Sequence, residues 1–168
     1  MEMNYTSAQA NKLLKKLNDE YTALLDKETR SRDFRAAMGE DVESVRPVYD
    51  YAETQIRLAA KIRKLKHAIN IFNATQTVDS FDMTIDELLV YIPQLTKRKS
   101  KLLEMKSRLP KERVEEQYGR QSRIIDYTYA NYDIAAVEAD YEKAADELSR
   151  AQLALDAVNQ RETFEWEA

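Results

Sequence analysis

Apolar residues recur at alternating spacings of three and four in several segments of the chain. The pattern is clear between Tyr49 and Asn73, where five apolar side chains share one face of a helix: Leu58, Ile62, Leu65, Ile69 and Phe72. A period near 3.6 residues predicts an amphipathic helix whose apolar face must be covered by other parts of the fold. Three further segments repeat the spacing, so we expect each of them to supply part of that cover.

The spacing predicts four helices, over residues of about 6–38, 47–73, 84–109 and 134–160. Thr6 or Ser7 can cap the first helix, because their hydroxyl oxygens accept hydrogen bonds from free backbone N–H groups. Gly39 should end it, since glycine readily adopts the left-handed conformation found at helix ends. Pro47 suits the first turn of the second helix, where its missing N–H would be unpaired anyway.

The third and fourth helices also carry local signals. Thr84 with Glu87 three residues later predicts a capping box at the start of the third helix. Pro93 cannot donate a backbone hydrogen bond, so it should kink this helix or divide it into two pieces. Lys99 interrupts the apolar seam, and Asp133 can cap the last helix, whose apolar pattern is unbroken.

Few residues in the chain break helices. It has only two glycines and three prolines among 168 residues, which is typical of long helices joined by short connections. We therefore expect a single, mainly α domain over residues 1–168. Two arrangements satisfy the four apolar faces: an elongated antiparallel four-helix bundle with coiled-coil-like packing, or two helical hairpins completed by a partner chain.

The connection Lys111–Asp133 is 23 residues long, which is uncommon for an unstructured link within a domain. Strand-forming residues lie toward its end: Ile124, Ile125, Tyr127, Thr128, Tyr129 and Tyr132. They predict a short extended or β arm near residues 122–132, paired with the turn at 77–81 or with a second subunit. Phe164 and Trp166 should dock on the bundle or on a neighbour, because large apolar groups are rarely left in water.

The residue types that carry most enzyme chemistry are scarce. There is no cysteine, and His67 is the single histidine, with Lys64 three residues before it, so a ferritin-like di-iron site is excluded. Two glycines cannot form a phosphate-binding loop, and no serine lies in a glycine-flanked turn. We expect no catalytic residues, no metal site and no cofactor. His67 is expected to be a surface or helix-capping residue.

Localisation and partners follow from composition. The absence of cysteine, of a secretory signal and of a segment approaching about 20 consecutive apolar residues favours a cytoplasmic protein without a membrane span. The net charge of −4 is mild, but it is unevenly distributed. Residues 53–72 carry five basic and one acidic side chain, residues 93–113 eight and two, and residues 126–168 three and eleven.

Two interpretations of this charge pattern remain. The acidic last helix can neutralise the basic second and third helices, within the fold or across a dimer. Alternatively, the basic helices form a face for nucleic acid, with tyrosines of the arm as stacking groups. The candidate binding residues are Asn70, Asn73, Arg123, Tyr127 and Tyr129.

Short motifs over residues 55–168 resemble the pattern of a bacterial family often labelled septicolysin-like. They comprise Ile69, Asn70, Asn73 and Thr75; Thr84, Ile85 and Leu88; Ser122, Arg123 and Ile124; and Leu148, Gln152, Asp156 and Asn159. The family's usual turn contains an Asp-Gly pair, whereas residues 78–81 of this chain contain no glycine. The resemblance implies an elongated, oligomeric helical protein of no established biochemical activity.

These observations favour a non-enzymatic structural or protein-interaction module that assembles as a homo-oligomer through its helical seams. The alternative is a nucleic-acid-binding protein that uses the basic second and third helices. A membrane-active toxin is a third hypothesis, disfavoured because no secretion signal and no segment able to enter lipid is visible.

Overall fold

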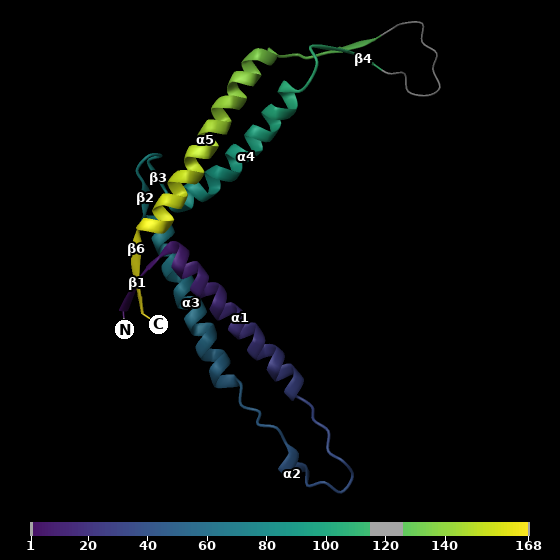
Figure 1. The fold of residues 1–168 in the computed structure, drawn as a ribbon, viewed down its shortest axis with the longest axis vertical. Coiled ribbons are helices and arrows are strands. Elements are labelled where there is room, and N and C mark those ends of the chain that lie inside the picture. Colours follow the sequence, from purple (N-terminus) through teal and green to yellow (C-terminus); the bar gives the residue numbers. More distant parts are fainter. Residues whose placement is uncertain (1, 115–125, 168) are drawn as a thin grey trace, which may run out of the picture. The chain divides into compact units, whose positions relative to one another are not determined.

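The computed structural model describes residues 2–114 and 126–167, with the side chain of Glu2 left out, and within them the chain is mainly helical (Figure 1). The helices are α1 Ser7–Ser31, α2 Val42–Val45, α3 Ala52–Thr75, α4 Ile85–Lys106 and α5 Ile134–Arg161. The strands are β1 Glu2–Thr6, β2 Thr77–Val78, β3 Met83–Thr84, β4 Lys111–Arg113, β5 Tyr127–Tyr129 and β6 Thr163–Glu167. The predicted mainly α fold is confirmed, and small antiparallel strand pairs accompany the helices.

The chain divides into two compact units. Unit 1 comprises Met1–Gln76 and Ala157–Ala168, and unit 2 comprises Thr77–Asp156. Each unit contains a pair of long antiparallel helices.

In unit 1, α1 lies along α3 (Figure 1). The core consists of buried apolar side chains from both helices and from β6: Ala10, Leu17, Leu65, Ile69 and Trp166. Partly buried neighbours extend this core along the predicted seam of α3, including Leu58 and Ile62. A capping box begins α1, in which the Thr6 hydroxyl accepts from the Gln9 backbone N–H and the Gln9 side chain accepts from the Thr6 N–H. The predicted apolar face and the cap at Thr6 are therefore confirmed.

The two ends of the described chain form a sheet in unit 1. Strand β1 pairs antiparallel with β6, with Met3 opposite Trp166 and Tyr5 opposite Phe164. Trp166 is buried, and the rings of Phe164 and Phe72 lie 5.0 Å apart. The predicted docking of the apolar tail is thus confirmed within unit 1. The sheet itself was not predicted, because the sequence pattern was assigned no strand before the first helix or after the last.

The boundaries between the first two long helices differ from the prediction. The first helix ends at Ser31, before residue 38, and the second begins at Ala52, after residue 47. The intervening residues are held against α1: the Tyr49 hydroxyl donates to Glu28 at 2.6 Å, and the buried Tyr51 hydroxyl lies 3.0 Å from Ser31 Oγ. These tertiary contacts replace the helix that local propensity predicted. Gly39 does adopt a positive φ of 94°, but in this connection, away from the helix end.

In unit 2, α4 and α5 run antiparallel, since Tyr91 bonds to Glu147 while Lys106 reaches Glu138 (Figure 1). A small core joins the C-terminal half of α4 to the N-terminal half of α5 and comprises Leu102, Val137 and Ala144. The capping box at Thr84 is confirmed. Residue Pro93 lies inside α4, which continues as one helical element, so a division into two helices is not observed.

The connections of unit 2 are built from short hairpins. β2 pairs with β3 around the predicted reversal, where Asp82 takes a left-handed conformation with φ of 49°. Aspartate tolerates this region better than most residues, so the turn forms without glycine. The predicted strand near residues 122–132 is confirmed at Tyr127–Tyr129, but its predicted partner is wrong. β5 pairs with β4, which lies at the other end of the same connection, and backbone hydrogen bonds join the two segments between residues 110 and 130.

Candidate functional site

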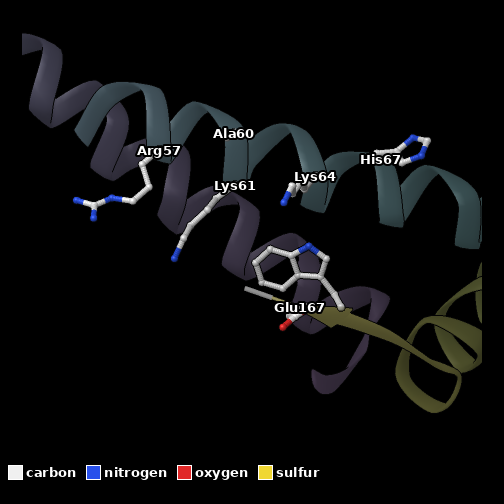
Figure 2. A pocket seen from close by; sticks show the side chains of 7 residues that line it. Arg57, Ala60, Lys61, Lys64, His67 and Glu167 are labelled. Atoms are coloured by element: carbon white, nitrogen blue, oxygen red, sulfur yellow. The ribbon is translucent and has the colours of Figure 1, made fainter. Parts of the chain in front are cut away.

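A groove of about 650 Å³ lies between α3 and the end of β6 in unit 1. Its lining comprises Arg57, Ala60, Lys61, Lys64, His67, Trp166 and Glu167. The cations at positions 57, 61 and 64 fall on one face because spacings of four and three return to the same side of a helix. Figure 2 shows Arg57 and Lys61 extending to the same side of α3, with Lys64 next along the helix and His67 beyond it.

The cationic side chains of this groove have no ion-pair partner within the part of the chain that the structure describes. Arg57 and Lys64 are exposed, whereas Lys61 is half-buried. The opposite wall is the indole of Trp166, of which 8% is exposed. The groove therefore combines positive charge with an aromatic surface, and this combination suits an organic anion.

The basic residues of α4 lie in a different environment. Lys106 Nζ lies 3.9 Å from Glu138 Oε1 and 3.8 Å from Glu142 Oε1, both on α5. It also lies 4.1 Å from the ring centroid of Tyr141, and Lys99 Nζ lies 5.9 Å from the same ring. The lysine that interrupts the predicted seam is thus accommodated over an aromatic face.

The β4–β5 hairpin carries a second basic and aromatic surface, in unit 2. Lys111 lies opposite Tyr129, and Arg113 lies opposite Tyr127. Cross-strand partners and alternate residues share one face of a hairpin, so all four side chains lie on the same side. Lys111 Nζ is 4.0 Å from the ring centroid of Tyr127 and 5.5 Å from that of Tyr129, and both tyrosines are exposed. We call these four residues the tyrosine face.

The candidate residues predicted from sequence are divided between the two units. Asn70 is exposed and Asn73 is half-buried, both on α3 in unit 1. Tyr127 and Tyr129 come together on β5 in unit 2, and Arg123 lies outside the described residues. The groove was not predicted from the sequence, because Trp166 reaches α3 only through the β1–β6 pairing. The one signal of the groove in the sequence was the helix face shared by the three cations of α3.

Two buried amide oxygens are notable among the residues that carry the family resemblance. Asn73 Oδ1 and Asn159 Oδ1 are both buried without a hydrogen-bond partner in the described part of the structure. Buried polar atoms are usually paired, so these two are exceptions within unit 1.

Shifted pKa values occur at helix contacts outside the groove. The hydrogen bond from the Tyr91 hydroxyl to Glu147 Oε1, 2.6 Å long, raises the pKa of Tyr91, and burial adds to the effect. The Tyr49 hydroxyl lowers the pKa of Glu28 by donating to its carboxylate, helped by Gln55, and the pKa of Tyr49 rises in turn. In each pair the neutral phenol donates to a carboxylate, which holds two segments together.

The residues that the structure describes contain no cluster of three or more His, Cys, Asp or Glu side chains placed to hold a metal ion. None of the helices within residues 2–114 and 126–167 is long and apolar enough to cross a membrane.

Comparison with known proteins gives a fold and no function. No family model matches the chain, and no curated protein matches its sequence. Among solved structures, it is similar to a functionally unknown conserved protein from Corynebacterium diphtheriae, with 16% identity and a TM-score of 0.58. The match covers 96% of this chain and 99% of that chain. At this identity the likeness shows the mainly helical fold alone, and the resemblance to the septicolysin-like family stays a prediction.

Proposed function

We propose that this chain is a non-enzymatic, cytoplasmic interaction module that associates with a second copy of itself through the outer faces of its helices. One observation carries the proposal: apolar side chains remain exposed on α4 and α5 although these helices already share the small core around Leu102, Val137 and Ala144. Leu89 and Leu103 are 44% and 45% exposed, Val90 is 58% exposed, and Leu153 on α5 is 66% exposed.

Helix geometry supports assembly through α4. Leu89 and Leu103 are separated by two heptads, so they lie on the same face, and exposed apolar residues at heptad spacing favour contact with another helix. A pair of helices covers only one side of each member, whereas a four-helix arrangement covers two. The predicted antiparallel four-helix bundle is thus part of this proposal and is formed when helical pairs join. The tail does not support association, because Trp166 is covered within unit 1.

The proposal is tested by sedimentation equilibrium over a range of protein concentrations. We expect a dimer or larger oligomer, and we expect Leu89→Lys combined with Leu103→Lys to yield monomers of unchanged helix content. Val48→Lys is the matched control, because Val48 is 85% exposed in the connection between α1 and α3. A wild-type chain that is monomeric at every concentration would contradict the proposal.

A second candidate function is binding of single-stranded nucleic acid, favoured by the tyrosine face. Exposed aromatic rings next to Lys111 and Arg113 can stack on bases while the cations contact phosphates. Exposed cations of α4 would extend this surface by contacting further phosphates of the nucleic acid: Lys97, Arg98 and Lys101.

Fluorescence polarisation of a labelled oligonucleotide tests this candidate. We expect binding that weakens as salt rises, because counterions are released from the phosphates. Tyr127→Leu with Tyr129→Leu should weaken it further, by about tenfold or more, from lost stacking. Tyr49→Leu is the aromatic control outside unit 2. Absence of binding at low salt would reject this function and leave the self-association proposal standing.

A further inference from the structure

We infer that the groove between α3 and β6 binds a nucleoside polyphosphate, with its phosphates against Arg57, Lys61 and Lys64 and its base against Trp166. This site differs from both the α4 face and the tyrosine face, so the inference goes beyond the proposed function.

The charges of the groove point to a ligand with more than one phosphate. Arg57 and Lys64 are seven positions apart on α3, with Lys61 between them, which is about 10 Å at 1.5 Å per residue. They form no ion pair with any described acidic side chain, unlike Lys106 of unit 2. Arginine can grip a phosphate with two parallel hydrogen bonds, and lysine binds it as a point charge. Three cations in a row match the length of a polyphosphate chain better than a single phosphate.

The aromatic wall points to a ligand that also carries a ring. Trp166 packs in the core of unit 1 and is paired with Met3 of β1, so its position does not depend on the ligand. The indole packs with Tyr5, whose ring centroid is 6.0 Å away, and the 8% of Trp166 that stays exposed is available at the lining of the groove. Tryptophan binds flat rings through stacking and dispersion.

The size of the groove favours one small molecule over a polymer. Its volume of about 650 Å³ lies within the range of about 300 to 1,000 Å³ for small-ligand sites. Its basic wall is confined to eleven residues of one helix, from Arg57 to His67. Glu167 lines the groove as well, and an acidic side chain in the lining disfavours a long polyanion.

The single tryptophan of the chain makes the inference directly measurable. Trp166 emission, excited beyond the absorption of the base, is followed while adenosine triphosphate, inorganic triphosphate or adenosine is added, and calorimetry gives the stoichiometry. We expect one adenosine triphosphate per chain, with inorganic triphosphate at least about tenfold weaker and adenosine without measurable binding.

Two pairs of variants assign the binding to the groove. Lys61→Ala and Lys64→Ala should each weaken adenosine triphosphate about tenfold, because each removes a charged contact to phosphate. Arg63→Ala and Lys66→Ala are matched controls, since they remove the same charge from exposed positions of α3 outside the groove lining. These controls should change the affinity less than about twofold, and circular dichroism should show α3 intact in all four variants.

Four results would overturn the inference. They are no binding of adenosine triphosphate, equal affinity for inorganic triphosphate, equal loss in groove and control variants, and tighter competitive binding of a single-stranded oligonucleotide. Sedimentation of the same variants separates this outcome from the self-association proposal, because none of these substitutions lies on α4.

Discussion

Units 1 and 2 are both built on two antiparallel helices, yet their basic residues lie in different surroundings. In unit 2, Lys106 is close to two glutamates of α5 and to the ring of Tyr141. In unit 1, Arg57, Lys61 and Lys64 have no ion-pair partner in the described structure and line a groove beside Trp166. Charge complementarity therefore accounts for Lys106 of α4 but not for Arg57, Lys61 and Lys64 of α3.

This difference shows which basic side chains are neutralised within the chain, which counts of charged residues could not show. In one of the two interpretations of the sequence, the acidic last helix neutralises both basic helices, within the fold or across a dimer. Contacts within the chain support this for Lys106, while the α3 cations remain available to an anion. A basic side chain is structural where an acidic side chain packs against it, and it is a candidate binding residue where an aromatic wall and a groove take that place.

The largest effect on stability is expected when a core side chain is removed from one unit at a time. Leu65 is fully buried in unit 1, so Leu65→Ala should lower the free energy of unfolding by about 2 to 5 kcal/mol. Urea titration followed by Trp166 emission measures this loss in unit 1. Leu102→Ala in unit 2 should move the Trp166 transition less, although circular dichroism should show its effect. Equal shifts of the Trp166 transition would mean that the two units unfold as one.

Helix caps offer a test in which the units should behave alike. Thr6 begins α1 and Thr84 begins α4 with the same capping box. Replacing either threonine by alanine should cost about 1 kcal/mol of stability, because backbone N–H groups lose their acceptor. Serine at the same positions keeps the hydroxyl and is the control. A cost confined to one unit would show that the other helix start is held by packing alone.

Lysine substitutions address the charge difference itself. Lys106→Ala should destabilise the protein by about 1 kcal/mol, the sum of weak ion pairs and a cation–π contact at a site where 23% of the side chain is exposed. Lys61→Ala should change stability by less than about 0.5 kcal/mol, since it breaks no described pair. Chemical denaturation at low salt measures both. A larger loss for Lys61 would assign that cation a structural role.

The smallest expected effect is a pH dependence of the Tyr91–Glu147 contact. The pKa of Tyr91 is raised above its ordinary value of 10.0 by donation to Glu147. A raised folded-state pKa means that the contribution is fully present below pH 10 and is lost as pH rises through the folded value. Wild type should therefore lose its stability advantage over Tyr91→Phe in alkaline solution. An advantage that is constant with pH would exclude the hydrogen bond as its source.

Local signals in the sequence predicted α4 and α5 well. The capping box at Thr84 and the unbroken seam after Asp133 lie within the helices they define, so no distant contact is needed to locate them. The ends of α1 and α3 were predicted less well, because Tyr49 and Tyr51 are held by residues about twenty positions away. Tertiary contacts of this kind override propensity without leaving a local pattern.

Strand pairing was the part of the fold that the sequence could not show. β4 consists of three charged residues without strand preference, and it is extended because β5 provides its partner. β1 is paired with β6 at the opposite end of the chain, and this pairing places Trp166 against α3. The α3 cations of the candidate groove could be found from helical spacing, but its aromatic wall depends on that long-range pairing.

Unit 2 is one continuous stretch, whereas unit 1 is assembled from residues on both sides of it. During synthesis the α4–α5 pair is therefore translated before β6, and α1 and α3 leave the ribosome long before the strand that covers them. We expect unit 2 to reach its native packing first, since domains form as their sequence becomes complete. Trp166 would then reach its buried position only after the α4–α5 pair has formed.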